Sequence, residues 1–215
     1  DQAGLGRSLR GLYSRFRMSD SLKSLMIPVY NIEGTASYRK TGPSRPHRGN
    51  PFLNEGGHAM WISNLKFDGV LNPPECPEVD IYDAVLGSTA APTYFPCHAF
   101  PIKTTPDSPT GSVVAIDGSV FDNPCISYMG ALRPHLPPDR PLIMIVIGTG
   151  YANQSICKED WDRYGALGVV DPKNDMPLIN ILFNAPETAL MSAFESELGK
   201  NLFVFNKSLT SGHYS

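Results

Sequence analysis

A single carboxylate stands at the end of a short apolar run. Asp117 follows residues 112–116, SVVAI, and precedes Gly118, which permits a sharp turn. A carboxylate at a rigid strand end can act as a general base when it is held about 2.6–3.2 Å from the proton that it takes. The same residues also fit an Asp-Gly hairpin turn between two short strands. Against the hairpin, residues 119–124, SVFDNP, lead at once into a helix start and leave too few residues for a return strand.

A nucleophile for that base is not evident. The G-x-S-x-G pattern of serine hydrolases does not occur in the 215 residues. Ser88 follows Gly87 at the end of an expected helix, without the strand-turn-helix elbow that exposes a nucleophilic hydroxyl. We therefore expect Ser88 to have a structural role, with its hydroxyl packed against a neighbour.

Other residues that could hold a ligand give weaker signals. Residues 148–150, GTG, close an apolar strand, and a glycine-rich turn can cradle a phosphate. Neither the third glycine of a dinucleotide site nor the Lys-Ser/Thr of a P-loop follows, so we interpret GTG as a tight turn. The five histidines are scattered and the four cysteines form no C-x-x-C pair. The sequence therefore predicts free thiols, no metal site and no cofactor.

The elements that must position Asp117 can be predicted from hydrophobic periodicity and from helix start and stop residues. Helices are predicted over residues 4–17, 79–91, 123–132 and 186–199, and strands over 25–32, 59–65, 112–116, 141–150 and 201–209. The strand, helix, strand order of residues 112–150 predicts a parallel pair. The fold class is therefore predicted to be α/β, with a mostly parallel sheet flanked by helices. Asp117 would then lie at the carboxyl edge, where such sheets collect ligands.

Composition limits the classes of function. The chain has 215 residues, of which 41% are hydrophobic, and we expect one domain over residues 1–215. Its net charge of -3, with basic residues that form no run, excludes nucleic acid as a partner. The longest apolar run, 142–148, is far shorter than the ~18–20 residues of a membrane-spanning helix.

Three segments, in this order, resemble the second half of the patatin-like phospholipases. They are STAAPTYFP at 88–96, DGSVFDNP at 117–124 and IVIGTG at 145–150. The corresponding family signatures read approximately S-A-A-P-x-Y-F, then D-G-G or D-G-A followed by N-N-P, then a strand ending in L-G-T-G. Residues 25–34 and 201–209 are similar to two further strands of the family, so the resemblance covers nearly the whole chain.

The resemblance implies a modified α/β-hydrolase type of sheet and a Ser-Asp dyad that hydrolyses acyl esters of lipids without calcium. The aspartate carries over to Asp117, with Gly118, Ser119 and Asn123 as supporting positions. The family's serine and oxyanion loop lie upstream of these motifs. We therefore expect this chain to be the C-terminal part of a patatin-like domain, with the N-terminal part missing, and to be inactive alone. A lipid or phospholipid substrate, peripheral membrane contact and a cytoplasmic or peripheral membrane location are implied as well.

Two residues depart from the family pattern. Ser119 stands where the family has Gly or Ala, and its hydroxyl is expected to be able to hydrogen-bond the Asp117 carboxylate. Asp122 stands where the family has the first Asn of N-N-P and adds a second negative charge near Asp117, while Asn123 keeps the helix cap before Pro124.

The segment upstream of Asp117 has an expected role as well. Small residues at Ala90 and Ala91 would let the preceding helix pass close to Asp117. Tyr94 and Phe95 would fill the apolar ground beside it.

Three functions follow from these residues. The favoured one is a lipid acyl hydrolase whose serine belongs to an upstream segment or another chain. The second is a catalytically inactive patatin-like module that binds lipid or protein. The third is an α/β protein that binds a small anion at the GTG turn of residues 148–150.

Overall fold

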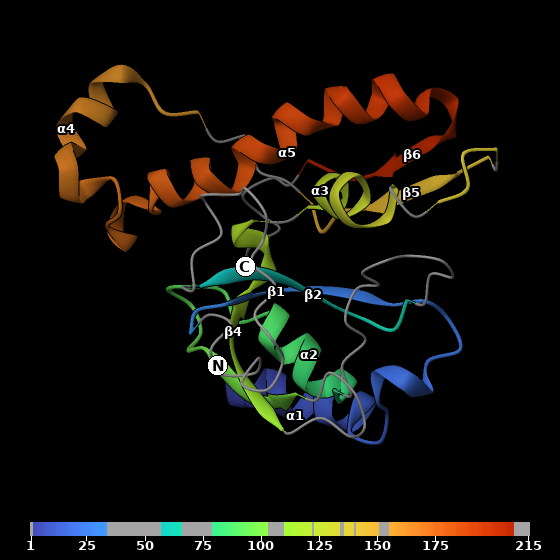
Figure 1. Ribbon diagram of the computed structural model, residues 1–215. Helices are drawn as coiled ribbons and strands as arrows, with labels where there is room; N and C mark the ends of the chain where they lie inside the picture. Colours follow the sequence, from blue (N-terminus) through green and yellow to red (C-terminus); the bar gives the residue numbers. More distant parts are fainter. Residues whose placement is uncertain are drawn as a thin grey trace, which may run out of the picture. The chain divides into compact units, whose positions relative to one another are not determined.

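The computed structural model describes residues 2–33, 57–65, 79–102, 110–121, 123–133, 136–139, 141–150 and 155–208 (Figure 1). The chain divides into two compact units, Asp1–Asp122 and Asn123–Ser215. The long surface excursion expected over residues 35–52 lies outside the described residues.

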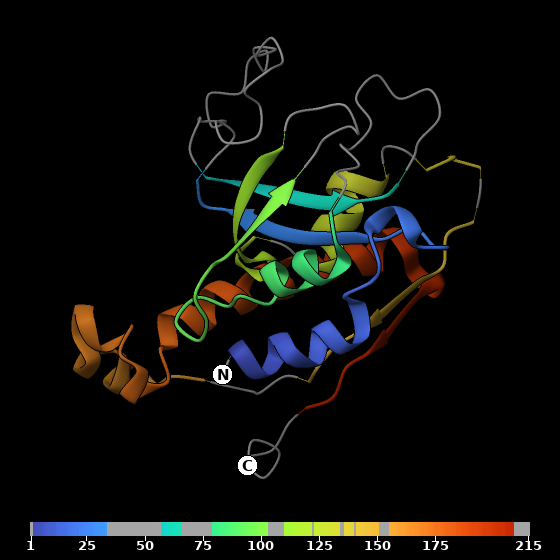
Figure 2. The same ribbon diagram turned by 90° about the horizontal axis from the view of Figure 1, so that it is seen from below.

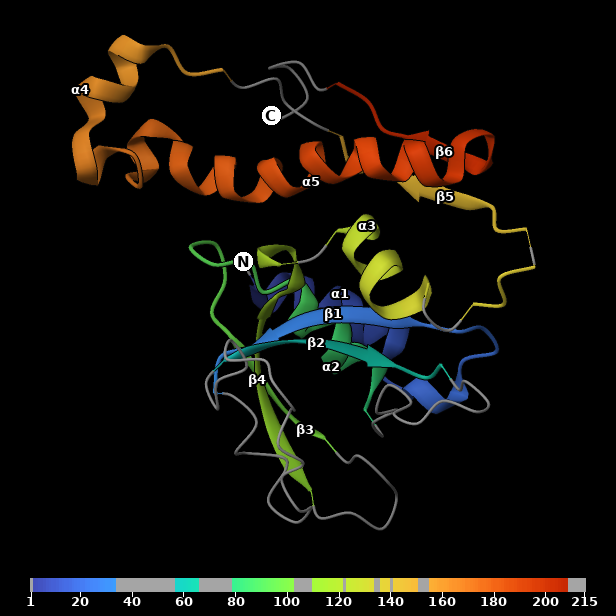
Figure 3. The same ribbon diagram turned by 45° about the horizontal axis from the view of Figure 1, so that its top comes forward.

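The first unit contains a four-stranded sheet (Figure 3). Its strands are β1 (Met26–Asn31), β2 (His58–Ser63), β3 (His98–Ile102) and β4 (Gly111–Asp117), in the spatial order β2-β1-β4-β3. Every neighbouring pair is antiparallel. The expected strands over 25–32, 59–65 and 112–116 are therefore present, whereas β3 was not expected.

The prediction of a mostly parallel sheet is wrong for this unit. It assumed that the strand ending at Asp117 pairs with the strand over residues 141–150. Instead β4 pairs on one side with β1 and on the other with β3, which precedes it closely in the sequence and runs in the opposite direction. Helices and mixed sheets together still give the chain an α/β class.

Two helices accompany this sheet, α1 (Gln2–Tyr13) and α2 (Ile81–Ser88). They lie together on one face of the sheet, and α2 contacts β1, β3 and β4 (Figure 2). The helices predicted over 4–17 and 79–91 are thus confirmed with shorter bounds. At the end of α2 the Thr89 hydroxyl donates to the carbonyl oxygens of Val85 (2.9 Å) and Leu86 (3.2 Å), which satisfies two carbonyl groups of the last turn.

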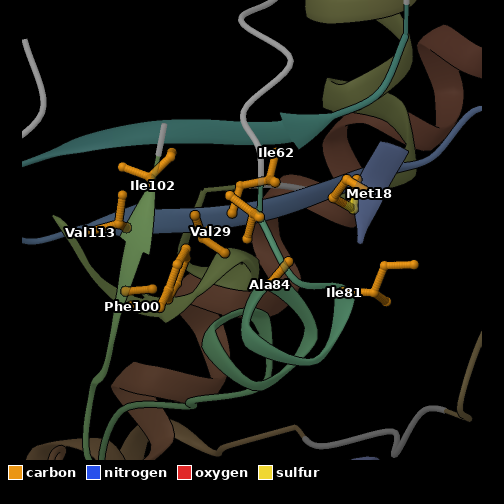
Figure 4. Close-up of a cluster of buried hydrophobic side chains, with 10 residues drawn as sticks. Met18, Val29, Ile62, Ile81, Ala84, Phe100, Ile102 and Val113 are labelled. Carbon is orange, nitrogen blue, oxygen red and sulfur yellow. The ribbon is translucent and has the colours of Figure 1, made fainter. Parts of the chain in front are cut away.

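The core of the first unit lies between α2 and the sheet (Figure 4). Its side chains come from every strand and from both ends of the unit's sequence: Met18, Val29, Ile62, Val79, Ile81, Ala84, Phe100, Ile102, Val113 and Ala115. The burial pattern of β4 alternates, with Val113 and Ala115 buried and their neighbours more exposed. This alternation is typical of a sheet whose one face packs on the core.

The described part of the second unit contains helices, together with short 3-10 turns, and a two-stranded parallel sheet. The helices are α3 (Pro124–Ile126), which continues as the π-helix Ser127–Leu132, then α4 (Lys158–Gly168) and α5 (Pro177–Leu198). The strands β5 (Met144–Ile147) and β6 (Leu202–Phe205) are parallel, and α5 lies between them in the sequence. The predicted strands 141–150 and 201–209 are therefore present, and they form the parallel pair that a helical crossover permits.

A second cluster of apolar side chains forms around Tyr128 and Phe194. The two rings meet edge to face with centroids 5.3 Å apart. In the described part of the chain, no helix is both long and apolar enough to cross a membrane.

Candidate functional site

Asp117 lies at the end of β4, where β4 extends beyond β3. The first residue of β3, His98, pairs with Ala115, and Asp117 pairs with Val29 of β1 on the other side. With no β3 residue opposite it, the main-chain N–H of Asp117 donates to the carbonyl oxygen of Ala90 at 3.0 Å. A loop that leaves α2 therefore completes the hydrogen bonding of the strand end.

The Asp117 carboxylate is half-buried and has one fixed oxygen. Oδ1 accepts the main-chain N–H of Ser119 at 2.8 Å and so caps the 3-10 helix Gly118–Val120. Oδ2 accepts no hydrogen bond from the described residues. The carboxylate is thus oriented through one oxygen, while the other is available to a proton donor.

Gly118 is required by its surroundings. It is buried, and a Cβ atom there would lie 2.4 Å from the carbonyl oxygen of Pro28 and 2.7 Å from the Pro28 Cβ. Since real Cβ atoms do not approach backbone this closely, any side chain at 118 would push β1 and the strand end apart. The glycine predicted to allow the turn at Asp117 also allows β1 to pass against it.

Ser119 contributes its backbone amide to the site. The side chain is exposed, and the bond to the Asp117 carboxylate comes from the Ser119 N–H. Among the described residues the carboxylate is bonded by this amide, which the 3-10 turn Gly118–Val120 brings to it, and the bond that the hydroxyl could make stays a prediction. The same amide would be present with Gly or Ala at this position.

Asn123 belongs to the second unit and caps its first helix, as predicted. Its Oδ1 accepts the N–H of Ile126 at 3.1 Å, ahead of the turn that contains Pro124. Asp122, proposed as a second charge near Asp117, lies outside the described residues.

The loop between α2 and β3, residues 89–97, fits the expectation in part. Ala90 is buried and its main-chain carbonyl accepts the Asp117 N–H, so this segment lies against the strand end. Tyr94, however, is 71% exposed and does not fill apolar ground beside Asp117. The residue before it, Thr93, has a φ of 75°, a left-handed conformation that a β-branched residue rarely adopts.

Two of the cysteines and Ser88 were also considered as candidate functional residues. Cys97 and Cys157 are free thiols, as expected, and among the described residues no group of three His, Cys, Asp or Glu side chains could hold a metal ion. Ser88 is the last residue of α2 and is half-buried. Its predicted structural role stays a prediction.

Sequence reasoning missed a polar pair that joins the first turn of α2, before this loop, to the first residue of β3, after it. His98 Nε2 and Asp83 Oδ1 are 2.8 Å apart, and each side chain is 20% exposed. Next to them the Arg10 guanidinium donates to the Tyr82 hydroxyl at 3.3 Å and lies over the Tyr82 ring. The hydrogen bond and charge interaction with Tyr82 raise the pKa of Arg10. No sequence motif links Asp83 to His98, because their proximity depends on the loop that separates them.

The GTG turn after β5 has its amides occupied. Gly148 N–H donates to the Phe205 carbonyl oxygen at 2.8 Å, and Gly150 N–H donates to Asn206 Oδ1 at 2.9 Å. A Cβ atom at Gly148 would lie 2.4 Å from the Asn206 side chain. These contacts support the tight turn that the sequence predicted and leave few amides for a phosphate.

The chain matches no protein-family model, and no curated protein matches it. Function must therefore be argued from the residues and their geometry. The site offers a half-buried carboxylate with one oriented oxygen, a strand end that only glycine can follow, and a loop bonded to that strand end. Such an arrangement can accept a proton from a hydroxyl brought to Oδ2.

Proposed function

We propose that these residues form the C-terminal part of a patatin-like domain that hydrolyses acyl esters of lipids, with Asp117 as its general base. The observation that carries the proposal is the 3.0 Å hydrogen bond from Asp117 N–H to the Ala90 carbonyl. It joins two separate segments, STAAPTYFP and DGSVFDNP, that carry the family resemblance. Two motifs that coincide at one carboxylate are better explained by a shared site than by independent turns.

In the proposed reaction a serine hydroxyl approaches Asp117 Oδ2 and transfers its proton as its oxygen attacks the ester carbonyl. The tetrahedral intermediate expels the alcohol, which takes the proton, and leaves an acyl-serine. Water then loses a proton to the same carboxylate as its oxygen attacks the acyl carbon. The bond from the acyl carbon to the serine oxygen breaks, and the serine oxygen takes the proton back, which releases the fatty acid and restores the serine and the carboxylate. The bond from Ser119 N–H to Oδ1 would hold the carboxylate in place through both steps.

The strand directions in the sheet are not evidence for this proposal. The four-stranded sheet is antiparallel, whereas the strand, helix, strand order of residues 112–150 predicts a mostly parallel one. The patatin-like type of fold is therefore part of the proposal, together with a lipid substrate and peripheral contact with a membrane surface. The serine would come from a segment or chain outside these residues, because they contain no G-x-S-x-G.

A specific observation favours a second candidate, an inactive patatin-like module that binds lipid or protein. Asp117 Oδ1 already caps the Gly118–Val120 turn, which is a sufficient structural reason for an aspartate here. In a binding module this cap would be the whole role of Asp117.

The test uses the complete domain, read from the full open reading frame, and measures hydrolysis of a short-chain ester and the thermal midpoint together. Asp117→Asn should stay folded and lose about 10²- to 10⁴-fold in rate, as expected when a positioned base is removed. Asp122→Asn should keep most of the activity, because a charge near a helix start matters mainly for stability. If Asp122→Asn were the inactive variant, or if both kept full activity, Asp117 would not be the base.

A covalent probe separates the enzyme from the inactive module. A fluorophosphonate should label one serine of the complete domain and no serine of the 215-residue chain. Ser88→Ala is the matched control, since it should leave both labelling and turnover within a few-fold of the wild type. Labelling of the 215-residue chain at any serine would overturn the proposed division of the dyad.

A further inference from the structure

The segment that runs from α2 through the loop of residues 89–97 to β3 is bridged by a hydrogen-bonded pair of side chains, Asp83 and His98. Asp83 lies in α2, before the loop, and His98 opens β3, directly after it. His98 Nε2 and Asp83 Oδ1 are 2.8 Å apart, and both side chains are four-fifths buried. Because Asp83 lies in the first turn of α2, this contact ties the start of α2 to the start of β3.

The imidazole is held from three sides. Its ring stacks on Phe100, with centroids 5.7 Å apart, and meets the edge of Tyr82, with centroids 6.3 Å apart. Phe100 belongs to the buried core, and Tyr82 is itself bonded by Arg10 of α1. The charged and titratable groups gathered around His98 are therefore Asp83, Tyr82 and, through Tyr82, Arg10. A ring fixed in this way transmits any displacement of α2 to β3.

Both elements that the contact joins, β3 and α2, are connected to the strand end that carries Asp117. His98 pairs in the sheet with Ala115, two residues before Asp117. On the other side, the loop that begins after α2 presents the Ala90 carbonyl to the Asp117 N–H at 3.0 Å. Within the loop, the Ala91 carbonyl accepts the N–H groups of Tyr94 (3.1 Å) and Phe95 (2.9 Å) around the left-handed Thr93. A backbone in that conformation persists only where surrounding contacts fix it.

We infer that Asp83 and His98 are positioning residues for Asp117: by clamping α2 to the start of β3, their hydrogen bond keeps the Ala90 carbonyl, which follows α2, on the Asp117 amide and so sets the orientation of the Asp117 carboxylate. The catalytic consequence rests on the proposed function, but the clamp itself is a property of the 215-residue chain. Neither residue belongs to a motif that carries the resemblance.

The first experiment follows amide hydrogen exchange in the 215-residue chain by NMR. His98→Ala should speed exchange of the Asp117 amide about 10-fold or more, because local opening of the loop breaks the bond to Ala90. His98→Gln keeps a side-chain donor and should restore much of the protection. Arg133→Ala, which breaks the ion pair of Arg133 with Glu197 in the second unit, should leave the Asp117 amide unchanged.

A double-mutant cycle keeps the inference testable if His98→Ala disturbs folding. Asp83→Asn, His98→Gln and the double variant should show non-additive effects on the Asp117 amide, since the two side chains act through one contact. Additive effects, or an Asp117 amide that exchanges at the wild-type rate in every variant, would overturn the inference.

Turnover in the complete domain then separates the inference from the proposed function. His98→Ala should lower kcat several-fold at unchanged KM, because the base is displaced while substrate binding is not, and His98→Gln should restore much of the kcat. If Asp117→Asn abolished turnover but the His98 and Asp83 variants left kcat and exchange unchanged, the function would stand and the inference would fail. If the variants exposed the Asp117 amide but Asp117→Asn remained fully active, the clamp would stand and the proposed function would fail.

Discussion

Gly87 of α2 lies directly over Ala115 of β4. A Cβ atom at Gly87 would stand 2.9 Å from the Cβ of Ala115 and 3.1 Å from the ring of Phe100. Helix and strand can approach this closely only because one side chain is absent and the other is a methyl group. The contact sets the distance between α2 and the sheet. It therefore also affects where the loop that follows α2 meets Asp117.

Gly87→Ala should destabilise the chain although alanine is the better helix former. Overpacking costs about 1–3 kcal/mol, which exceeds the ~1 kcal/mol gained from helix propensity. Gly11→Ala in α1 is the matched control, because nothing lies within 4 Å of a Cβ atom there. It should stabilise the chain by about 0.5–1 kcal/mol. Urea midpoints measure both, and a stabilising Gly87→Ala would contradict the close approach of α2 to β4.

Gly118→Ala should destabilise the end of β4. The new methyl group would meet the Pro28 carbonyl oxygen at 2.4 Å, and relief requires a shift of the β1 backbone, for which about 1–3 kcal/mol is expected. Ser119→Ala provides the comparison, because the Ser119 amide that bonds Asp117 remains. Its unfolding free energy should stay within about 0.5 kcal/mol of the wild type. Equal losses in the two variants would show that the 2.4 Å approach does not limit residue 118.

The raised pKa of Tyr128 predicts that the stability of the chain depends on pH in the alkaline range. Burial, and then the charge and hydrogen bond of Glu197, raise the pKa of Tyr128 above its ordinary value of 10.0. Because the folded-state pKa is the raised one, this contribution is fully present below pH 10.0 and is lost as the pH rises through the folded-state pKa. Tyr128→Phe should lose less stability than the wild type between about pH 9 and pH 11.

The control for that titration is an exposed tyrosine. Tyr94→Phe removes a hydroxyl from a side chain that is 71% exposed and should follow the wild-type pH profile. Thermal midpoints taken over the same pH range test both variants. Parallel profiles for the wild type and Tyr128→Phe would mean that the Tyr128 phenol does not resist ionisation in the folded chain.

Elements were predictable from the sequence where local signals agreed with packing. The alternating strand 112–116 and the N-cap at Asn123 rest on nearest neighbours and are confirmed. β3 was missed because Pro101 weakens a strand signal, and its position at the edge of the sheet is where a strand proline is tolerated. Strand pairing depends on distant residues, which is why the sequence did not reveal that β4 is antiparallel to β1.

The helices of the second unit show a similar limit. Pro186 was interpreted as part of a first turn, yet α5 begins at Pro177 and Pro186 lies within it. No helix is among those predicted for residues 158–168, where α4 lies. Charged side chains one turn apart support its start, through the ion pairs of Lys158 with Asp162 and of Asp160 with Arg163 (2.6 Å).

Within the candidate site, Asp117 could be predicted from the sequence, but the residues that surround it could not. The strand-end position of Asp117 and the need for glycine after it follow from local sequence. The Ala90 carbonyl, the Pro28 backbone and the Asp83–His98 pair all lie 19 or more residues before Asp117 in the sequence, and the sheet and the loop bring them together.

The GTG turn supplies the last prediction, which concerns anions. The amides of Gly148 and Gly150 are bonded to Phe205 and to Asn206 Oδ1, and Asn206 Oδ1 also accepts the Lys207 N–H at 3.0 Å. We therefore expect inorganic phosphate, compared with chloride at equal ionic strength, not to raise the thermal midpoint of the chain. Asn206→Ala should lower the free energy of unfolding by about 0.5–1.5 kcal/mol, since the Gly150 amide loses its partner. A phosphate-dependent rise in the midpoint that disappears in Asn206→Ala would identify the turn as an anion site instead, and would restore the third function that the sequence allowed.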